Sequence, residues 1–161
     1  MGLEGIAFEI RNEYGKQLFD LLDGIADPAW HWFVGAEEAY FAGNGQLSEP
    51  FFFETDVTLD GKSFLAHISK EDYILIFADL KAFPTAESVA SLLTEREFME
   101  SPCILGINIS DSAHVILYSR ESWIIHEMIK RVESLGYGST RFLSHDNLVY
   151  AIWGWREKYL N

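Results

Sequence analysis

Residues 126–130 contain the beginning of a zinc-binding pattern. His126 and Glu127 start like the His-Glu-x-x-His helix, in which two imidazoles one turn apart hold zinc and the glutamate acts as a general base. Lys130 stands where the second imidazole would be, and its positive charge repels a metal ion. The motif is therefore broken, and we interpret these residues as the polar side of an amphipathic helix.

The remaining histidines and acids give no stronger signal for catalysis or metal binding. Asp111 with His114, and His145 with Asp146, could supply acid–base pairs. Both pairs lie where turns are expected, and aspartate is common in turns because its side chain bonds the local backbone. The five histidines are not spaced like zinc ligands, and the acids of residues 49–60 lack the alternating order of a calcium loop.

The single cysteine and the glycines indicate no catalytic chemistry either. Cys103 follows a proline, begins an apolar stretch and has no neighbouring base, so we expect a buried and unreactive thiol. Residues 43–45, Gly-Asn-Gly, tolerate positive φ and predict a turn, without the spacing of a phosphate-binding loop. We therefore predict no catalytic residue, no bound metal and no cofactor.

The tryptophans are more informative. Trp30, His31 and Trp32 alternate along an expected strand, which sends both indole rings to one face and the imidazole to the other. Trp123 falls nearly opposite the apolar stripe of a helix expected over residues 120–135. Partly exposed tryptophan beside acids is typical of a protein-binding surface or a ligand pocket. The alternative is that each ring packs beneath a neighbouring element. The candidate binding residues are Trp30, His31, Trp32, Glu37, Glu38 and Trp123.

Negative charge is concentrated in the first part of the chain. The 161 residues carry 25 acids and 12 lysines or arginines, a formal net charge of −13. Residues 1–60 hold twelve of the acids against two bases, which accounts for −10 of that charge. Such a field repels nucleic-acid phosphates and anionic lipid and attracts a basic protein or a cation. We expect a basic protein partner, no nucleic acid and no membrane; the alternative is an acidic surface that serves solubility alone.

Composition and length favour one folded domain over residues 1–161. Apolar residues make up 48% of the chain and aromatic residues 15%, which is enough to bury a core. No apolar run approaches the roughly 20 residues needed to cross a bilayer, and the first residues lack the pattern of a secretion signal. A single cysteine cannot form an internal disulfide, so we expect a reducing, cytoplasmic environment.

Periodicity predicts strands and helices in an irregular order. Strands are expected over residues 3–10, 29–34, 36–42, 73–83, 103–109, 113–119, 140–144 and 148–153. Helices are expected from Asn12 to Ile25, over residues 60–70, from Pro84 to Pro102 with a second start at Thr94, and over residues 120–135. Tight turns are expected near Gly35, around Ser110-Asp111-Ser112 and around His145-Asp146-Asn147, and a short helical turn in the tail at 155–160.

This order of elements selects a fold class. Many strands follow one another through short turns, so several neighbouring strands must be antiparallel. Strict alternation of one strand with one helix is missing, which argues against a Rossmann-like or barrel fold. We predict an α+β fold, with about four helices packed on a mixed, largely antiparallel sheet.

Three stretches of sequence resemble a known family. They are GIAFEIRNEYGKQLFDLL at residues 5–22, YILIFADLKAF at 73–83, and VILYSRESWIIHEMIKRVESLGY through VYAIW at 115–153. With these stretches the chain resembles a family of small uncharacterised bacterial proteins, mostly from Bacillus-type Gram-positive bacteria, classified as a domain of unknown function. The resemblance implies a stand-alone bacterial cytoplasmic protein and supplies no catalytic residue.

Two functional hypotheses from different classes follow. The first is a non-catalytic acidic protein that recognises a basic or aromatic-rich protein partner, as an inhibitor or immunity-type factor does. The second is a small-molecule-binding or enzymatic domain with an aromatic pocket between sheet and helices, containing polar groups such as His31, His114 or Asp111. A homodimer formed through an exposed sheet edge is a third hypothesis.

Overall fold

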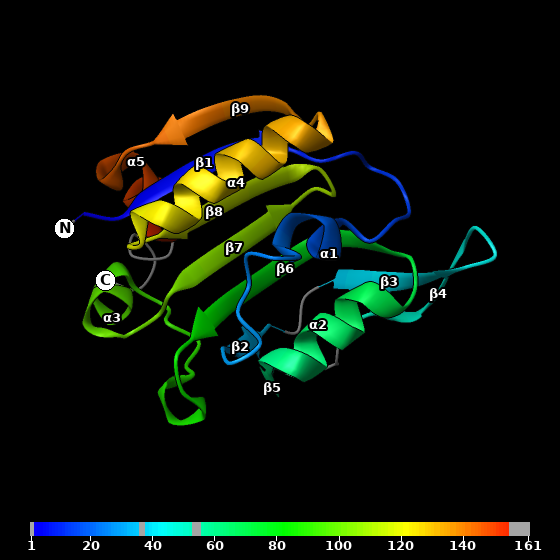
Figure 1. Ribbon diagram of the computed structural model, residues 1–161, viewed down its shortest axis with the longest axis horizontal. Coiled ribbons are helices and arrows are strands. Elements are labelled where there is room, and N and C mark those ends of the chain that lie inside the picture. Colours follow the sequence, from blue (N-terminus) through cyan, green and yellow to red (C-terminus); the bar gives the residue numbers. More distant parts are fainter. Residues whose placement is uncertain (1, 36–37, 53–55, 155–161) are drawn as a thin grey trace.

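Short helices and strands follow one another along residues 2–35, 38–52 and 56–154, the parts of the chain that the computed structural model describes (Figure 1). The strands are β1 (Glu4–Glu9), β2 (His31–Val34), β3 (Glu38–Gly43), β4 (Gln46–Pro50), β5 (Val57–Asp60), β6 (Tyr73–Phe83), β7 (Leu105–Ser110), β8 (His114–Ser119) and β9 (Gly138–Leu143). The helices are α1 (Gln17–Leu22), α2 (Gly61–Lys70), α3 (Glu95–Glu100), α4 (Ser122–Leu135) and α5 (His145–Val149), with a 3₁₀ turn η1 (Ala86–Ser88) and a π-helix η2 (Tyr150–Gly154).

The described strands form one antiparallel sheet. Its order is β4-β3-β6-β7-β8-β1-β9, and each pairing among these strands is antiparallel. β2 and β5 lie off this path, and β2 pairs antiparallel with both β5 and β6. The structure confirms the predicted α+β class. It also confirms the largely antiparallel sheet, since every pairing among the described strands is antiparallel.

The two faces of the sheet are covered differently. α1, α2 and α4 lie across one face, the near side in Figure 1. They enclose an apolar cluster with alternate residues of the central strands, such as Leu80, Ile107 and Leu117. The other face carries a smaller cluster that includes Phe98 of α3 and Trp153 of η2. The helices of the first face are therefore the ones that can form walls above the sheet.

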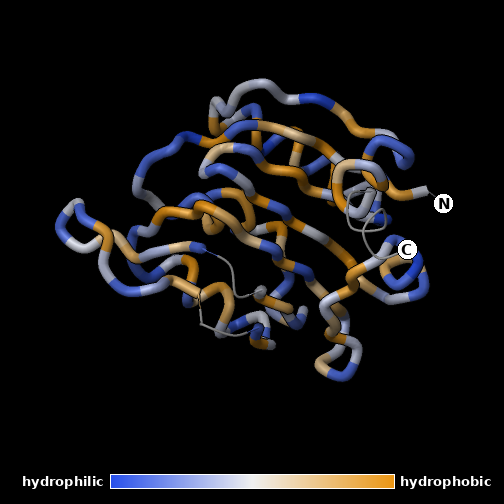
Figure 2. Tube along the Cα trace, turned by 180° about the vertical axis from the view of Figure 1, so that it is seen from behind, coloured by the Kyte–Doolittle hydropathy of each residue, from blue (hydrophilic) through white to orange (hydrophobic). Residues whose placement is uncertain are grey.

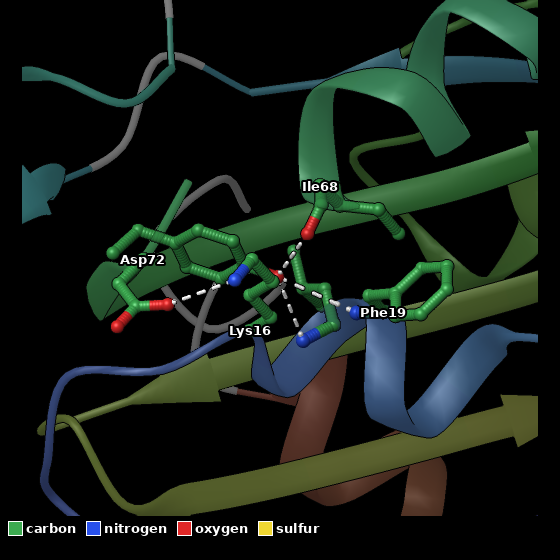
Figure 3. A network of polar contacts seen from close by, with 6 residues as sticks. Lys16, Phe19, Ile68 and Asp72 are labelled. Atoms are coloured by element: carbon green, nitrogen blue, oxygen red, sulfur yellow. Dashed lines mark hydrogen bonds and ion pairs between the residues drawn. The ribbon is translucent and has the colours of Figure 1, made fainter. Parts of the chain in front are cut away.

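Tyr73, the first residue of β6, connects α1 and α2 through hydrogen bonds to partners that include Phe19 and Ile68, which Figure 3 labels. Its hydroxyl donates to the carbonyl oxygen of Ile68 in α2 at 2.8 Å, and accepts from the amide nitrogens of Leu18 and Phe19 at 3.1 and 3.4 Å. Those two N–H groups belong to the first turn of α1, where Lys16 supplies no side-chain cap. One phenol therefore replaces a helix cap and links two helices.

Tyr73→Phe is expected to lower the free energy of unfolding by about 2–3 kcal/mol, because two donors and one acceptor lose their partner. Burial raises the pKa of the Tyr73 hydroxyl, so the unfolded chain ionises first. The stabilisation is therefore fully present below about pH 10 and is lost as the pH rises through the folded pKa. Urea denaturation should show a wild-type advantage that shrinks at about pH 11; an advantage below about 0.5 kcal/mol at neutral pH would contradict the capping role.

The segment around Gly35 does not form the predicted tight turn. β2 pairs with residues 80–83 of β6 and β3 with residues 73–77, both antiparallel to it. The chain thus continues in one direction along the same side of β6, and the amide of Gly35 donates to the carbonyl oxygen of Asp79 at 3.0 Å. The predicted turn is wrong because β6, at eleven residues, is long enough to pair with both strands in succession.

The first helix is shorter than predicted. It begins at Gln17, and Asn12 does not cap it. Gly15 forms two backbone hydrogen bonds with Tyr73, at 2.9 and 3.1 Å, which hold the preceding chain in a bridge to β6. Tyr14 consequently lies outside the buried stripe and is 39% exposed.

Residues 84–93 do not form the predicted helix. Only η1 forms there, because the Thr85 and Ser88 side chains each bond the other residue's backbone in a capping box. The second start is confirmed, since Thr94 caps α3 by accepting from the amide of Glu97 at 3.1 Å.

The predicted hairpin of residues 140–144 and 148–153 is also wrong, because α5 and η2 form in place of its second strand. Leu148 and Ile152 are buried, whereas Tyr150 between them is 81% exposed. A strand would place all three on one face, and helical spacing separates them. The tail predicted as a helical turn, residues 155–160, lies outside the described residues.

Other predicted elements are confirmed. β6 covers the predicted residues 73–83, and α2 begins after Asp60, whose carboxylate caps the amide of Ser63. The hairpin turn at residues 43–45 joins β3 to β4 with positive φ at Asn44 and Gly45. β7 and β8 form the predicted hairpin, and α4 ends at Gly136 in the left-handed conformation.

Candidate functional site

An open groove of about 660 Å³ lies between α1, α2 and the beginning of α4. Phe19 of α1 and Leu65 of α2 contribute apolar walls, and residues 23–28 form one side. Trp30, just before β2, and Trp123 of α4 also line it. Two of the predicted binding residues, far apart in the sequence, therefore meet at one groove.

The loop that carries Trp30 is fixed by local bonds. Asp27 accepts the amide of Ala29 on Oδ1 at 2.8 Å, and its carbonyl oxygen accepts the amide of Trp30 at 3.0 Å. The same loop touches the start of α2, where a Cβ added to Gly61 would lie 2.3 Å from the Pro28 carbonyl oxygen. Trp30 is thus held firmly and is only 9% exposed.

Trp123 lies in the first turn of α4 and is 50% exposed. Arg131 connects α4 to α1, since its guanidinium donates to the carbonyl oxygens of Asp20 and Asp23 at 2.8 and 2.6 Å. These carbonyl oxygens lie at the C-terminal end of α1, where a cation is favoured by the helix dipole. Arg131 therefore fixes α4 relative to the loop on the other side of the groove.

The groove has carboxylates and no cation among its described lining residues. Asp23 and Asp27 supply the carboxylates. In the described chain the Asp23 carboxylate has no ion pair or hydrogen bond, and Asp27 uses only Oδ1 in its turn. Arg131 is close to the lining residue Gly24, with a guanidinium nitrogen 3.8 Å from where a Cβ there would lie, and its N–H groups donate to backbone carbonyl oxygens. Indole rings, apolar walls and the unpaired carboxylate oxygens of Asp23 and Asp27 can together bind a cationic group with an aliphatic stem.

The other predicted binding residues lie elsewhere. Trp32 is fully buried under α2 and stacks on Phe64 at a centroid distance of 4.1 Å, so for this ring the alternative of packing beneath a neighbouring element is confirmed. His31 is half-buried, on the side of β2 opposite to Trp32. Glu38 is exposed at the start of β3, and Glu37 lies outside the described residues.

The histidines considered for catalysis are held in other contacts. His114 is exposed, with Nδ1 3.7 Å from a carboxylate oxygen of Glu9. His145 accepts the backbone amide of Leu3 on Nδ1 at 3.0 Å, and its Nε2 lies 3.3 Å from a carboxylate oxygen of Glu95. The His145 ring thereby connects the N-terminal segment to α3, which is a structural role.

Cys103 is buried, and burial raises the pKa of its thiol to about 12, so the reactive thiolate does not form at neutral pH. Lys130 pairs with Glu127 at 3.3 Å, and both side chains lie on the exposed side of α4, in agreement with their interpretation as part of the polar side of an amphipathic helix. Among the residues that the structure describes, no three His, Cys, Asp or Glu side chains lie together as metal ligands. None of the described helices combines the length and apolarity needed to span a membrane.

The acids of the groove are the residues that sequence reasoning missed. A signal for them exists, since Asp23 and Asp27 stand four residues apart between a helix and Trp30. Phe19 and Leu65 carry no such signal, because partly exposed apolar residues on amphipathic helices are ordinary.

The sheet and the groove define an α+β protein with an open, acidic and aromatic surface site. The chain belongs to the family described as "Protein of unknown function (DUF2691)", whose model matches residues 3–152. It is 29% identical over 143 residues to the uncharacterised protein YncE of Bacillus subtilis (strain 168), with 89% of this chain and 93% of the relative covered. No solved structure matches the chain. The predicted resemblance to a bacterial family of unknown function is thus confirmed.

Proposed function

We propose that this protein is a non-catalytic binding protein whose groove accepts a basic segment of a protein partner. The observation that carries the proposal is that Trp30, Trp123, Asp23 and Asp27 line the same groove. An indole face and a carboxylate are both complementary to a guanidinium or ammonium group. The apolar walls are complementary to the aliphatic stem of the same side chain.

Arginine suits this groove better than lysine. Its guanidinium is planar and can stack on an indole ring while its N–H groups reach a carboxylate. A cation–π contact contributes roughly 0.5–1 kcal/mol at an exposed site and about 2 kcal/mol where water is excluded. Trp123 offers the larger accessible surface, since Trp30 is mostly covered.

The net charge of −13 adds a long-range attraction for a basic partner. Part of that charge lies away from the groove, because Glu4 and Glu9 belong to β1, near the opposite edge of the sheet from β3. These distant acids affect the rate of encounter more than the bound complex. We place the interaction in the cytoplasm, where a chain with one cysteine meets reducing conditions.

Calorimetric titration with hexa-arginine, hexa-lysine and hexa-glutamate tests the proposal. Hexa-arginine should bind most tightly and hexa-glutamate should not bind. Affinity should fall at least about tenfold when salt is raised from about 0.02 to about 0.2 M, because the charges are screened. Trp123→Ala should weaken hexa-arginine binding roughly five- to tenfold, and Asp23→Asn about threefold.

Two variants outside the groove serve as matched controls. Phe142→Ala removes another exposed aromatic ring, in β9, and Asp146→Asn removes another exposed acid, in α5. Both should bind hexa-arginine as the wild type does. If either weakened binding as much as the groove variants do, the acidic surface as a whole would be responsible, and the groove proposal would be wrong.

A further inference from the structure

A second cavity lies on the face of the sheet opposite to the groove. It has a volume of about 280 Å³ and is formed by β6, β7, β8 and the π-helix η2. Figure 2 shows this face, where hydrophilic and hydrophobic stretches alternate along the strands. The lining residues that matter for recognition are Asp79, Asn108 and His114 on the polar side and Phe77, Ile116 and Ile152 on the apolar side.

One lining residue of this cavity, Asp79, forms a mostly buried ion pair with Lys81. Lys81, with 3% of its side chain exposed, donates to Oδ1 of Asp79 at 2.6 Å, and its ammonium lies 5.5 Å from the ring centroid of Phe33. The Asp79 side chain is 15% exposed and lines the cavity. Apolar residues of similar size are often as stabilising as a buried ion pair. Stability alone therefore does not account for this pair in an otherwise apolar strand.

Asn108 lies beside Asp79 in the neighbouring strand. The two residues are register partners in β6 and β7, so their Cβ atoms are about 4.5–5.5 Å apart on the same face. Within the described chain, the side-chain amide of Asn108 and Oδ2 of Asp79 have no hydrogen-bond partner. A carboxylate oxygen and a carboxamide thus present adjacent, unused hydrogen-bonding groups to the cavity.

We propose that this cavity binds a small, uncharged, planar molecule with a hydrogen-bond donor next to an acceptor, as on an amide or the edge of a nucleobase. The donor bonds Oδ2 of Asp79 and the acceptor takes an N–H of Asn108. Phe77 and Ile152 provide apolar surfaces for the flat faces of the ligand. The volume of about 280 Å³ lies just below the usual range of roughly 300–1,000 Å³ for ligand sites, which fits a single ring system.

The charges around the cavity favour a neutral ligand. A cation would lie close to the buried ammonium of Lys81, which already neutralises Asp79. An anion would meet Asp79 and also Glu9, whose carboxylate lies beside His114. The ligand is therefore held by hydrogen bonds and apolar contact, and its binding should depend little on salt.

Titration of ¹⁵N-labelled protein with cytosine, adenine and uracil tests this proposal, with guanidinium and acetate as charged counterparts. At least one base should bind with a Kd of about 1 mM or below and shift the side-chain amide resonances of Asn108. Asn108→Ala should weaken that binding about tenfold or more, whereas Asn147→Ala, which removes an exposed asparagine of α5, should have no effect. Saturating hexa-arginine should leave the base affinity unchanged, because the groove is on the other face.

If Asn108→Ala does not fold, the side-chain amide resonances of Asn108 in the wild-type protein still show whether a base binds at this residue. The proposal would be overturned if none of the three bases bound with a Kd of about 1 mM or below. It would also be overturned by a base that binds without shifting Asn108, or by guanidinium or acetate that binds as tightly as the bases do. None of these outcomes depends on peptide binding in the groove.

Discussion

Gly61→Ala is expected to lower the free energy of unfolding by roughly 3 kcal/mol or more. The added Cβ would lie 2.3 Å from the carbonyl oxygen of Pro28 and 2.7 Å from that of Trp30. Both contacts are with backbone atoms, so no side chain can rotate away to relieve them. The loop at residues 28–30 cannot easily move away from α2 either, because Trp30 packs beside Trp32, with ring centroids 6.3 Å apart. Urea denaturation followed by far-UV circular dichroism measures the loss.

Gly138→Ala is the matched control for this substitution. Gly138 begins the edge strand β9, and no atom lies within 4 Å of an added Cβ. Its free energy of unfolding should stay within about 0.5 kcal/mol of the wild type. Equal stability of the two variants would show that α2 does not pack against residues 28–30 as the structure describes.

Lys81→Met should be the second strongly destabilising change, by roughly 3 kcal/mol. Methionine fills a similar volume in the apolar surroundings of Phe33, so packing is largely kept. The loss comes from Asp79, whose mostly buried carboxylate would lose its ammonium partner. Thermal and urea unfolding of the variant measure the effect.

The double variant with Lys81→Met and Asp79→Leu separates charge from packing. Removal of both charges should recover most of the stability lost in Lys81→Met, because no unpaired carboxylate remains. It should also abolish binding of nucleobases in the cavity. A double variant as unstable as Lys81→Met would mean that the pair is held by shape, and the electrostatic explanation would be wrong.

Elements with strong local signals could be predicted from the sequence. β6 is a long, mostly apolar strand, and its boundaries agree with the prediction. α4 is an amphipathic helix with a glycine at its end, and Ile125, Met128 and Val132 are buried as the periodicity indicates. In both elements, periodicity and end signals agree over many residues.

Elements that depend on distant partners could not be predicted. The direction of the chain after Gly35 follows from pairing with β6, about 40 residues later, and no local residue encodes it. Residues 148–153 are equally apolar as strand or helix, and only the exposure of Tyr150 distinguishes the two. Short apolar segments are ambiguous in this way because periodicity needs length.

The sequence predicted part of the candidate sites. The position of Trp123 opposite the buried stripe of α4 predicted an exposed ring, and its exposed fraction of 50% agrees. Its meeting with Trp30 required the packing of α4 against α1. The ion pair of Asp79 and Lys81 could also have been predicted, because two opposite charges on one face of a buried strand must pair.

The indole resonances of the tryptophans, followed by NMR during titration with hexa-arginine at low salt, test the groove most directly. We predict that the indole N–H signals of Trp123 and Trp30 shift progressively, while that of Trp153, buried on the other face, stays in place. Tight binding of the peptide with an unchanged Trp123 signal, or a shift of Trp153 as large as that of Trp123, would contradict it.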